Sequence, residues 1–175
     1  MDAIILPSIT NPRELEIVRR KIRHKLKINP WFLVKIDNDK SCGEINSILK
    51  SADGVLVSRR HLAYSMSPAI VPTKCKEMIA ATKRAAKLIL LESDILGSMR
   101  TNHMPTRAEI SDLANAVMDG ADGICLAEDI AQGGYEKKSL ELCFATIQDL
   151  ENNLLVRGGE RQKSDFSSWN SSCFI

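Results

Sequence analysis

The segment PTRAEISDLANAVMDGADG, from Pro105 to Gly123, decides the fold because it carries the signals for a loop, a helix and the entry into a strand. Thr106 and Glu109 have the spacing of a capping box, in which each side chain binds a backbone N–H group that the first helical turn leaves unpaired. A helix is therefore expected to begin directly after Thr106. The favoured role for both side chains is helix capping rather than catalysis.

The rest of this segment predicts where the helix packs and where it stops. Its apolar stripe has helical spacing and consists of Ile110, Leu113 and Val117. Gly120 provides the left-handed residue that commonly closes a helix, so the helix should end near Asp119. The apolar run at 122–127 then predicts a strand that is buried on both faces of a parallel sheet.

The same alternation of strand and helix recurs along the chain. Short apolar runs lie at 3–6, 31–36, 54–58, 87–91 and 123–127. Between and after them, helices are predicted from Asn11 and Pro12, over 41–52, from Pro72, over 107–119 and over 137–155. Strands that alternate with helices indicate an α/β domain with a parallel sheet and right-handed crossovers. Residues 156–175 are rich in glycine, serine and charge without periodicity, which predicts a flexible C-terminal tail.

Composition excludes several classes of partner. The chain has 175 residues, 44% of them hydrophobic, and a formal charge of +2, which gives no argument for a nucleic-acid or membrane partner. The basic run from Arg19 to Lys27 is interrupted by apolar residues at helical spacing and is interpreted as a solvated helix face. The five cysteines lack metal-ligand spacing, which favours a reducing, cytoplasmic location. No apolar run reaches the roughly 20 residues of a membrane span.

In parallel α/β proteins the chemistry lies at the carboxyl ends of the strands. These positions carry VKIDN (34–38), VSRRHLA (57–63), LLESDILGSM (90–99) and CLAEDIAQGGY (125–135). Together with the segment at 105–123, this ordered series resembles the latter half of the catalytic (β/α)₈ barrel of pyruvate kinase. The resemblance covers roughly residues 1–152. It implies a partial TIM-like barrel of about five βα units, with residues 1–155 as the barrel domain.

The family reaction transfers a phosphoryl group between phosphoenolpyruvate and ADP, giving pyruvate and ATP in glycolysis. The resemblance implies that Lys35 is the catalytic lysine that stabilises the enolate of pyruvate. It also places Asp37 where a glutamate of the family holds the divalent metal ion, one methylene shorter. Mg²⁺ and K⁺ are the cofactors that the resemblance implies.

The next strand end departs from the family pattern, Ala-Arg-Gly-Asp-Leu-Gly. Arg59 keeps the arginine, Arg60 replaces the glycine near the substrate carboxylate, and His61 replaces the aspartate that is the second metal ligand. A neutral imidazole is a poor ligand for Mg²⁺, so a ligand and a negative charge are lost. Ser93 stands where the family has a threonine and keeps a hydroxyl for substrate. In the last loop, Ser-Gly-Glu-Thr-Ala has become residues 127–131, Ala-Glu-Asp-Ile-Ala.

The opening residues resemble the fourth strand of the family barrel. Strands one to three, the lid domain and the regulatory domain then have no counterpart, and the resemblance implies that the phosphate-binding arginine and the K⁺ ligands lie there. Five βα units cannot close a barrel of eight, so unpaired strand edges and an uncovered interior are expected.

Three hypotheses for function remain open. The first is a pyruvate-kinase-like protein with weak or lost activity, serving as an interaction module for a full-length pyruvate kinase subunit or for itself as a homo-oligomer. The second is residual phosphoryl transfer that uses Lys35, Asp37 and Ser93, with Asp94 or Asp129 as a substitute metal ligand. The third is a fragment of a longer product or a degenerate copy.

Overall fold

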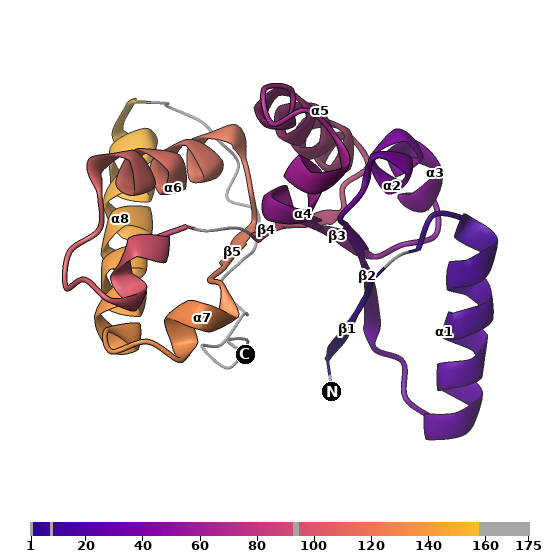
Figure 1. Cartoon of the computed structure of the whole chain (residues 1–175). Coiled ribbons are helices and arrows are strands. Elements are labelled where there is room, and N and C mark those ends of the chain that lie inside the picture. Colours follow the sequence, from indigo (N-terminus) through magenta and orange to yellow (C-terminus); the bar gives the residue numbers. More distant parts are fainter. Residues whose placement is uncertain (1, 8, 93–94, 158–175) are drawn as a thin grey trace.

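A single parallel sheet of five strands organises the described residues. The computed structural model describes residues 2–7, 9–92 and 95–157. The strands are β1 (Ala3–Leu6), β2 (Trp31–Ile36), β3 (Gly54–Ser58), β4 (Leu88–Glu92) and β5 (Gly123–Cys125). They pair in the order β1-β2-β3-β4-β5, so each strand lies beside its neighbour in sequence (Figure 1). A sheet that grows in one direction is the order of a barrel sector, whereas a doubly wound sheet reverses its order. The expected partial TIM-like α/β fold is confirmed.

The helices occupy the connections between strands. They are α1 (Pro12–Leu26), α2 (Asp39–Gly43), α3 (Ile45–Ile48), α4 (Arg59–Ser65), α5 (Val71–Arg84), the 3₁₀ turn η1 (Gly97–Arg100), α6 (Arg107–Asp119), α7 (Glu128–Ala131) and α8 (Glu136–Arg157). None of the helices in the described ranges is long and apolar enough to cross a membrane. Helix α8 continues through Arg157, and the tail expected beyond it, at 158–175, lies outside the described residues.

One predicted helix is divided in the structure, and three short helical elements were not predicted. The single helix expected over 41–52 is divided into α2 and α3, because Glu44 leaves helical geometry with φ −91° and ψ 11° between them. Helix α4 was not predicted, and it begins directly at Arg59 after β3. Helix α7 and the turn η1 were not predicted either, whereas α1, α5, α6 and α8 match their predicted positions within a few residues. The side chain of the N-cap residue Asn11 accepts a hydrogen bond from the Arg13 N–H at 2.9 Å.

Strand register sorts the side chains of the sheet into two faces, since paired residues of a parallel sheet share a face. The face toward α1–α5 is apolar and buried, and consists of Phe32, Val34, Ile36, Val55, Val57, Ile89 and Leu91. The opposite face is apolar before the strands reach their carboxyl ends, at Leu33 and Leu56, and becomes polar at those ends. Only the polar end can therefore carry chemistry.

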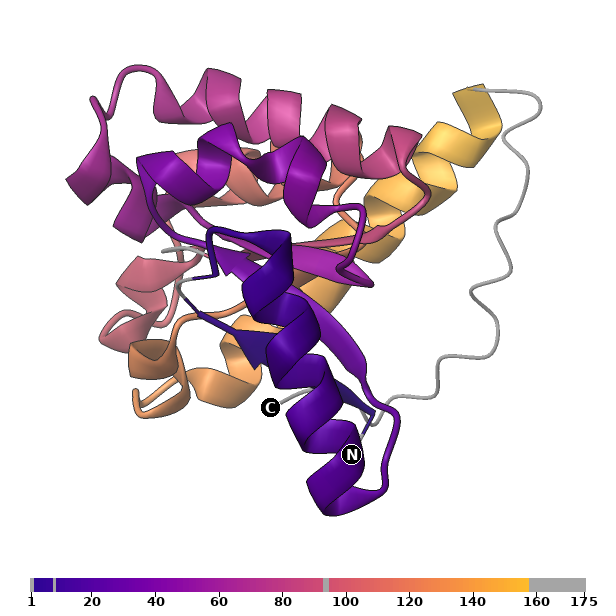
Figure 2. The ribbon, with the colours of Figure 1, turned by 90° about the vertical axis from the view of Figure 1, so that its right-hand side faces the viewer.

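A second core lies beyond β4, among η1, α6, α7 and α8. Its buried members are Ile95, Leu96, Met99, Leu113, Ile130 and Cys143. Figure 1 shows these elements grouped apart from α1–α5, with β5 between the two groups, whereas in the perpendicular view of Figure 2 the two groups overlap. The prediction that β5 is buried on both faces is wrong, because all three of its residues are only partly buried and it pairs with β4 alone in the described sheet.

The tripeptide Ala-Asp-Gly precedes both β3 and β5, and its aspartate fastens the start of the neighbouring strand. Asp53 donates its N–H to the Phe32 carbonyl at 2.9 Å, and its Oδ2 accepts the Phe32 N–H at 2.8 Å. Asp122 repeats this pair of bonds with Ile89, at 2.9 Å each. Each aspartate thus closes a hydrogen-bonded ring with the first residues of the neighbouring strand. The Asp53 ring fixes the register of β3 against β2, and the Asp122 ring fixes the register of β5 against β4.

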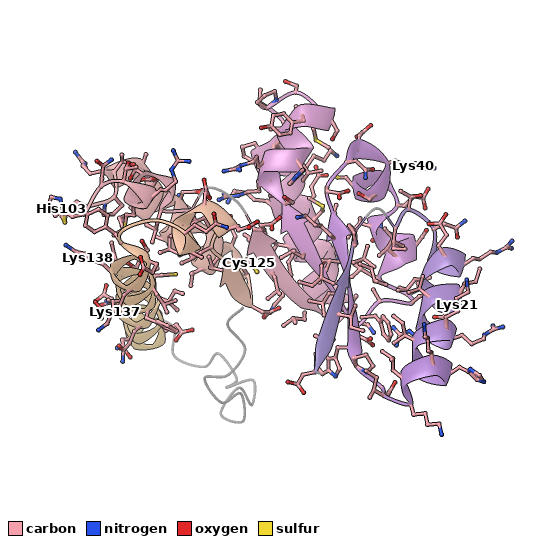
Figure 3. All side chains as sticks on the ribbon, turned by 60° about the horizontal axis from the view of Figure 1, so that its bottom comes forward. Lys21, Lys40, His103, Cys125, Lys137 and Lys138 are labelled. Carbon is pink, nitrogen blue, oxygen red and sulfur yellow. The ribbon has the colours of Figure 1, made fainter. Side chains whose placement is uncertain are left out.

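A basic side chain from the helix before each of these strand pairs neutralises the aspartate. Arg19 of α1 lies 2.9 Å from Asp53, and Lys83 of α5 lies 2.5 Å from Asp122. Arg19 is itself buried, donates to the Ser51 carbonyl at 2.7 Å and stacks over the Phe32 ring at 4.7 Å. The interpretation of the basic run as a solvated face is therefore wrong for Arg19, whereas Lys21 reaches into solvent (Figure 3).

We predict that Gly54→Ala lowers the free energy of unfolding by about 3 kcal/mol, since the new Cβ would lie 2.6 Å from the rigid Leu88 carbonyl oxygen. Gly123→Ala is the matched control, because its Cβ would meet only the movable tip of the Leu90 side chain. Urea unfolding followed by circular dichroism measures both. Equal losses would contradict the close approach of β3 and β4.

Asp53→Ala is expected to cost about 3 kcal/mol, because it leaves the Phe32 N–H and the buried Arg19 guanidinium without their carboxylate. Glu77→Ala is the control, since its pair with Lys74 on α5 is exposed to solvent and should contribute little to stability. Chemical unfolding at neutral pH compares the two variants. A loss for Asp53→Ala no larger than the control's would refute the role of the aspartate.

Candidate functional site

Four side chains, from four consecutive strands, lie at the polar carboxyl end of the sheet. Ser58, Glu92 and Cys125 are register partners at the ends of β3, β4 and β5, and Lys35 lies near the end of β2. All four share the face opposite α1–α5. Figure 3 marks Cys125 at this edge, between the two groups of helices.

Lys35 forms an ion pair with Glu92. The Lys35 Nζ lies 2.6 Å from Glu92 Oε2, and the two side chains are 19% and 29% exposed. Burial disfavours the ionised form of Glu92, but hydrogen bonds from Lys35 and Ser58, with the charges of Lys35 and His61, outweigh it and hold the Glu92 pKa below its usual value. The lysine expected to be catalytic therefore already contacts a carboxylate.

His61 joins this pair through Ser58. The buried Ser58 hydroxyl lies 2.7 Å from His61 Nδ1, and Ser58 is the register partner of Glu92 on β3. Because Ser58 bonds the ring, it does not cap the N-terminus of α4. Lys35, Glu92, Ser58 and His61 thus form one continuous polar network.

The two arginines after β3 contact different helices. Arg59 binds Asp112 of α6 through two hydrogen bonds, at 2.6 and 2.5 Å, which joins α4 to the second core. Arg60 lies 3.8 Å from Asp129 of α7, which also lies 4.0 Å from Arg100. Asp129, considered as a substitute metal ligand, is therefore neutralised by arginines.

Asp37 stands at the entry to α2. Its Oδ1 accepts a hydrogen bond from the Asn38 side-chain amide at 2.7 Å, while Asn38 caps α2 through Ser41. Within the described ranges, no three histidine, cysteine, aspartate or glutamate side chains gather as a metal site. Since Mg²⁺ requires oxygen ligands in octahedral geometry, the described residues do not fit a complete magnesium site. Ser93 and Asp94 lie outside the described residues.

Cys125 completes the site as a neutral thiol. Burial, together with the nearby charge of Glu92, raises the Cys125 pKa, and the opposing effect of Lys35 is smaller. A thiol that remains protonated is neither a nucleophile nor a ligand for a hard cation. Its contribution to the site is packing beside Glu92.

Sequence reasoning missed Glu92 and Ser58. The sequence did carry a signal, because each residue is the first polar side chain at the end of an apolar strand, on the face that Lys35 shares. Their pairing depends on the order of β2, β3 and β4 in the sheet. The polarity of Glu92 and Ser58 indicated that they lie at the strand ends, but it could not show which side chains they contact.

Glu109 anchors the segment that leads from β4 to α6. Its carboxylate accepts the Ser98 N–H at 2.7 Å, the Ser98 hydroxyl at 2.6 Å and the Thr106 N–H at 2.7 Å. Thr106 in turn accepts the Glu109 N–H at 3.2 Å, so the predicted capping box is confirmed. Gly120 closes the helix with φ 102°, also as predicted. Although burial opposes ionisation, the hydrogen bonds from Ser98 and Thr106 lower the Glu109 pKa.

Comparison with known proteins identifies the family. The model of the pyruvate kinase barrel domain matches residues 1–140. A pyruvate kinase of Agrobacterium vitis is 31% identical over 157 residues, which are 90% of this chain and 32% of the relative. A pyruvate kinase of Thermotoga maritima is 31% identical over 93% of this chain and 35% of its own length, and one of Agaricus bisporus is 40% identical over 66% and 22%.

The chain belongs to the pyruvate kinase family. It spans about a third of the length of the Agrobacterium and Thermotoga relatives. Its five strands form a sector of the barrel domain, with the polar network at the carboxyl ends of the strands.

Glu109 should stabilise the fold in a pH-dependent manner. Because its folded pKa lies below the ordinary value of 4.5, its stabilisation is full above pH 4.5 and is lost as the pH falls through the folded pKa. We predict that Glu109→Gln lowers the thermal midpoint at pH 7 and that the difference from wild type shrinks progressively as the pH falls below 4.5. A difference that persists unchanged in acid would contradict this assignment.

Proposed function

We propose that this chain carries the strand-end lysine of a pyruvate kinase site, Lys35, but transfers little or no phosphoryl group between phosphoenolpyruvate and ADP on its own. The contact between Lys35 Nζ and Glu92 at 2.6 Å supports this proposal most directly. An ammonium group neutralised by a neighbouring carboxylate has less charge to offer a developing enolate. The weak or lost activity thus follows from the ion pair itself.

The other proposed roles have uneven support. Arg60 and His61 would contact substrate, although Arg60 lies near Asp129 and His61 binds Ser58. Asp37 would be the remaining Mg²⁺ ligand, and Ser93 would offer its hydroxyl to substrate. Phosphoryl transfer depends on positioning and on neutralising phosphate charge, and one carboxylate ligand supplies little of either. We therefore assign no step to Mg²⁺ or K⁺ in this chain.

Association with another chain is the second candidate function. Strand β1 pairs only with β2 in the described sheet, and the Ile5 side chain on the face opposite the helices is 43% exposed. An unpaired edge beside apolar surface favours association. The proposed partner is a second copy of this chain or a full-length pyruvate kinase subunit.

A reducing compartment such as the cytoplasm is part of the proposal. The described cysteines, Cys42, Cys75, Cys125 and Cys143, are all free thiols. Burial raises the pKa of Cys75 and Cys143 to about 11, so neither thiol ionises readily at neutral pH.

A lactate-dehydrogenase-coupled assay with phosphoenolpyruvate, ADP, Mg²⁺ and K⁺ tests the catalytic proposal. The wild-type chain and Lys35→Met should both give the background rate, with Lys50→Met as the control for an exposed lysine. Wild-type turnover that Lys35→Met abolishes would overturn the proposal and establish an enzyme. Light scattering on the chain, alone and mixed with an intact pyruvate kinase, tests association. A monomer under both conditions would exclude the interaction module.

A further inference from the structure

The Lys35–Glu92 contact joins two strands that are not neighbours. Lys35 is on β2 and Glu92 on β4, with β3 between them in the sheet. Two strand spacings amount to about 10 Å, so the two side chains must lean toward each other across β3. Leu56, the register partner of Lys35, lies beneath this crossing and is buried. The Lys35 side chain thus extends over Leu56 to the Glu92 carboxylate.

Glu92 is itself held in place for this contact. The buried Ser58, whose hydroxyl contacts His61 Nδ1, is the register partner of Glu92 on the intervening strand β3. Cys125 is its register partner on β5. A carboxylate fixed from the side by neighbouring strands loses little further freedom when it pairs with the lysine. The arrangement therefore differs from an exposed surface ion pair.

We propose that Glu92 is a built-in counter-ion that occupies the anion-binding position at Lys35 and keeps external carboxylates out. Its two oxygens and single negative charge are those of a small organic acid. The inference rests on the proposed function, since it concerns the same lysine. A tethered carboxylate competes at an effective concentration on the order of millimolar or above, so a free carboxylate at similar concentration gains little access.

The experiment measures acetylation of Lys35 in the full chain by mass spectrometry, with a limiting amount of an amine-reactive acetyl ester. Glu92→Gln keeps the shape and a hydrogen-bonding oxygen but removes the charge. Lys35 should react about fivefold faster in this variant, because the ion pair no longer holds the amine. Glu77→Gln is the matched control, since it frees only the exposed Lys74 of α5. In Glu77→Gln the Lys35 rate should equal that of wild type.

Pyruvate is the probe for the vacated anion position. At about 10 mM it should at least halve the Lys35 rate in Glu92→Gln and leave the wild-type rate unchanged. Equal protection in both proteins, or protection in neither, would overturn the inference. Glu92→Asp is the second variant, which keeps the charge with a shorter reach and should give an intermediate Lys35 rate.

The two proposals can fail separately. Turnover in the coupled assay that depends on Lys35 would refute the proposed loss of activity, whatever the acetylation shows. Pyruvate protection in Glu92→Gln without turnover would support the counter-ion and leave the proposed function intact. Protection that is absent from a folded Glu92→Gln chain without turnover would refute the counter-ion alone.

Discussion

Two aspartates, Asp53 and Asp122, fix the register of neighbouring strands in this protein. Each closes a two-bond ring with the start of the neighbouring strand and is neutralised by a basic side chain of the preceding helix. A parallel strand that slipped by one residue would turn its apolar side chains to the wrong face. The rings prevent that slip between β2 and β3 and between β4 and β5, and the strand ladder sets the register of β3 against β4. Together they determine which side chains meet at the carboxyl ends of the strands.

The chemistry at the carboxyl ends of the strands follows from that alignment. With β2, β3 and β4 level, Lys35 can reach across Ser58 to Glu92, and His61 joins through the serine. Every charge in this network has its partner within the chain. Lys35 is therefore already paired with a carboxylate of the same chain.

Sequence analysis correctly predicted the features of the fold that local sequence signals determine. The capping box of Thr106 and Glu109, the left-handed Gly120 and the apolar strands are all encoded within a few residues, and the structure confirms them. The break between α2 and α3 at Glu44 was not predicted, and the burial of Arg19 depends on contacts with residues far along the chain. The Lys35–Glu92 pair could not be predicted from the sequence, because it depends on the order of the strands in the sheet. The roles of Asp37, Arg60 and Ser93 remain predictions.

Amide hydrogen exchange of Phe32 and Ile89, followed by NMR, tests most directly whether the aspartate rings hold the sheet in register. We predict that both N–H groups exchange as slowly as the most protected amides of β3, because they open only when the sheet unfolds. Exchange as fast as that of exposed loop amides would show that the strand starts are not fastened. The register of β2 against β3, on which the Lys35–Glu92 contact depends, would then lack its proposed cause.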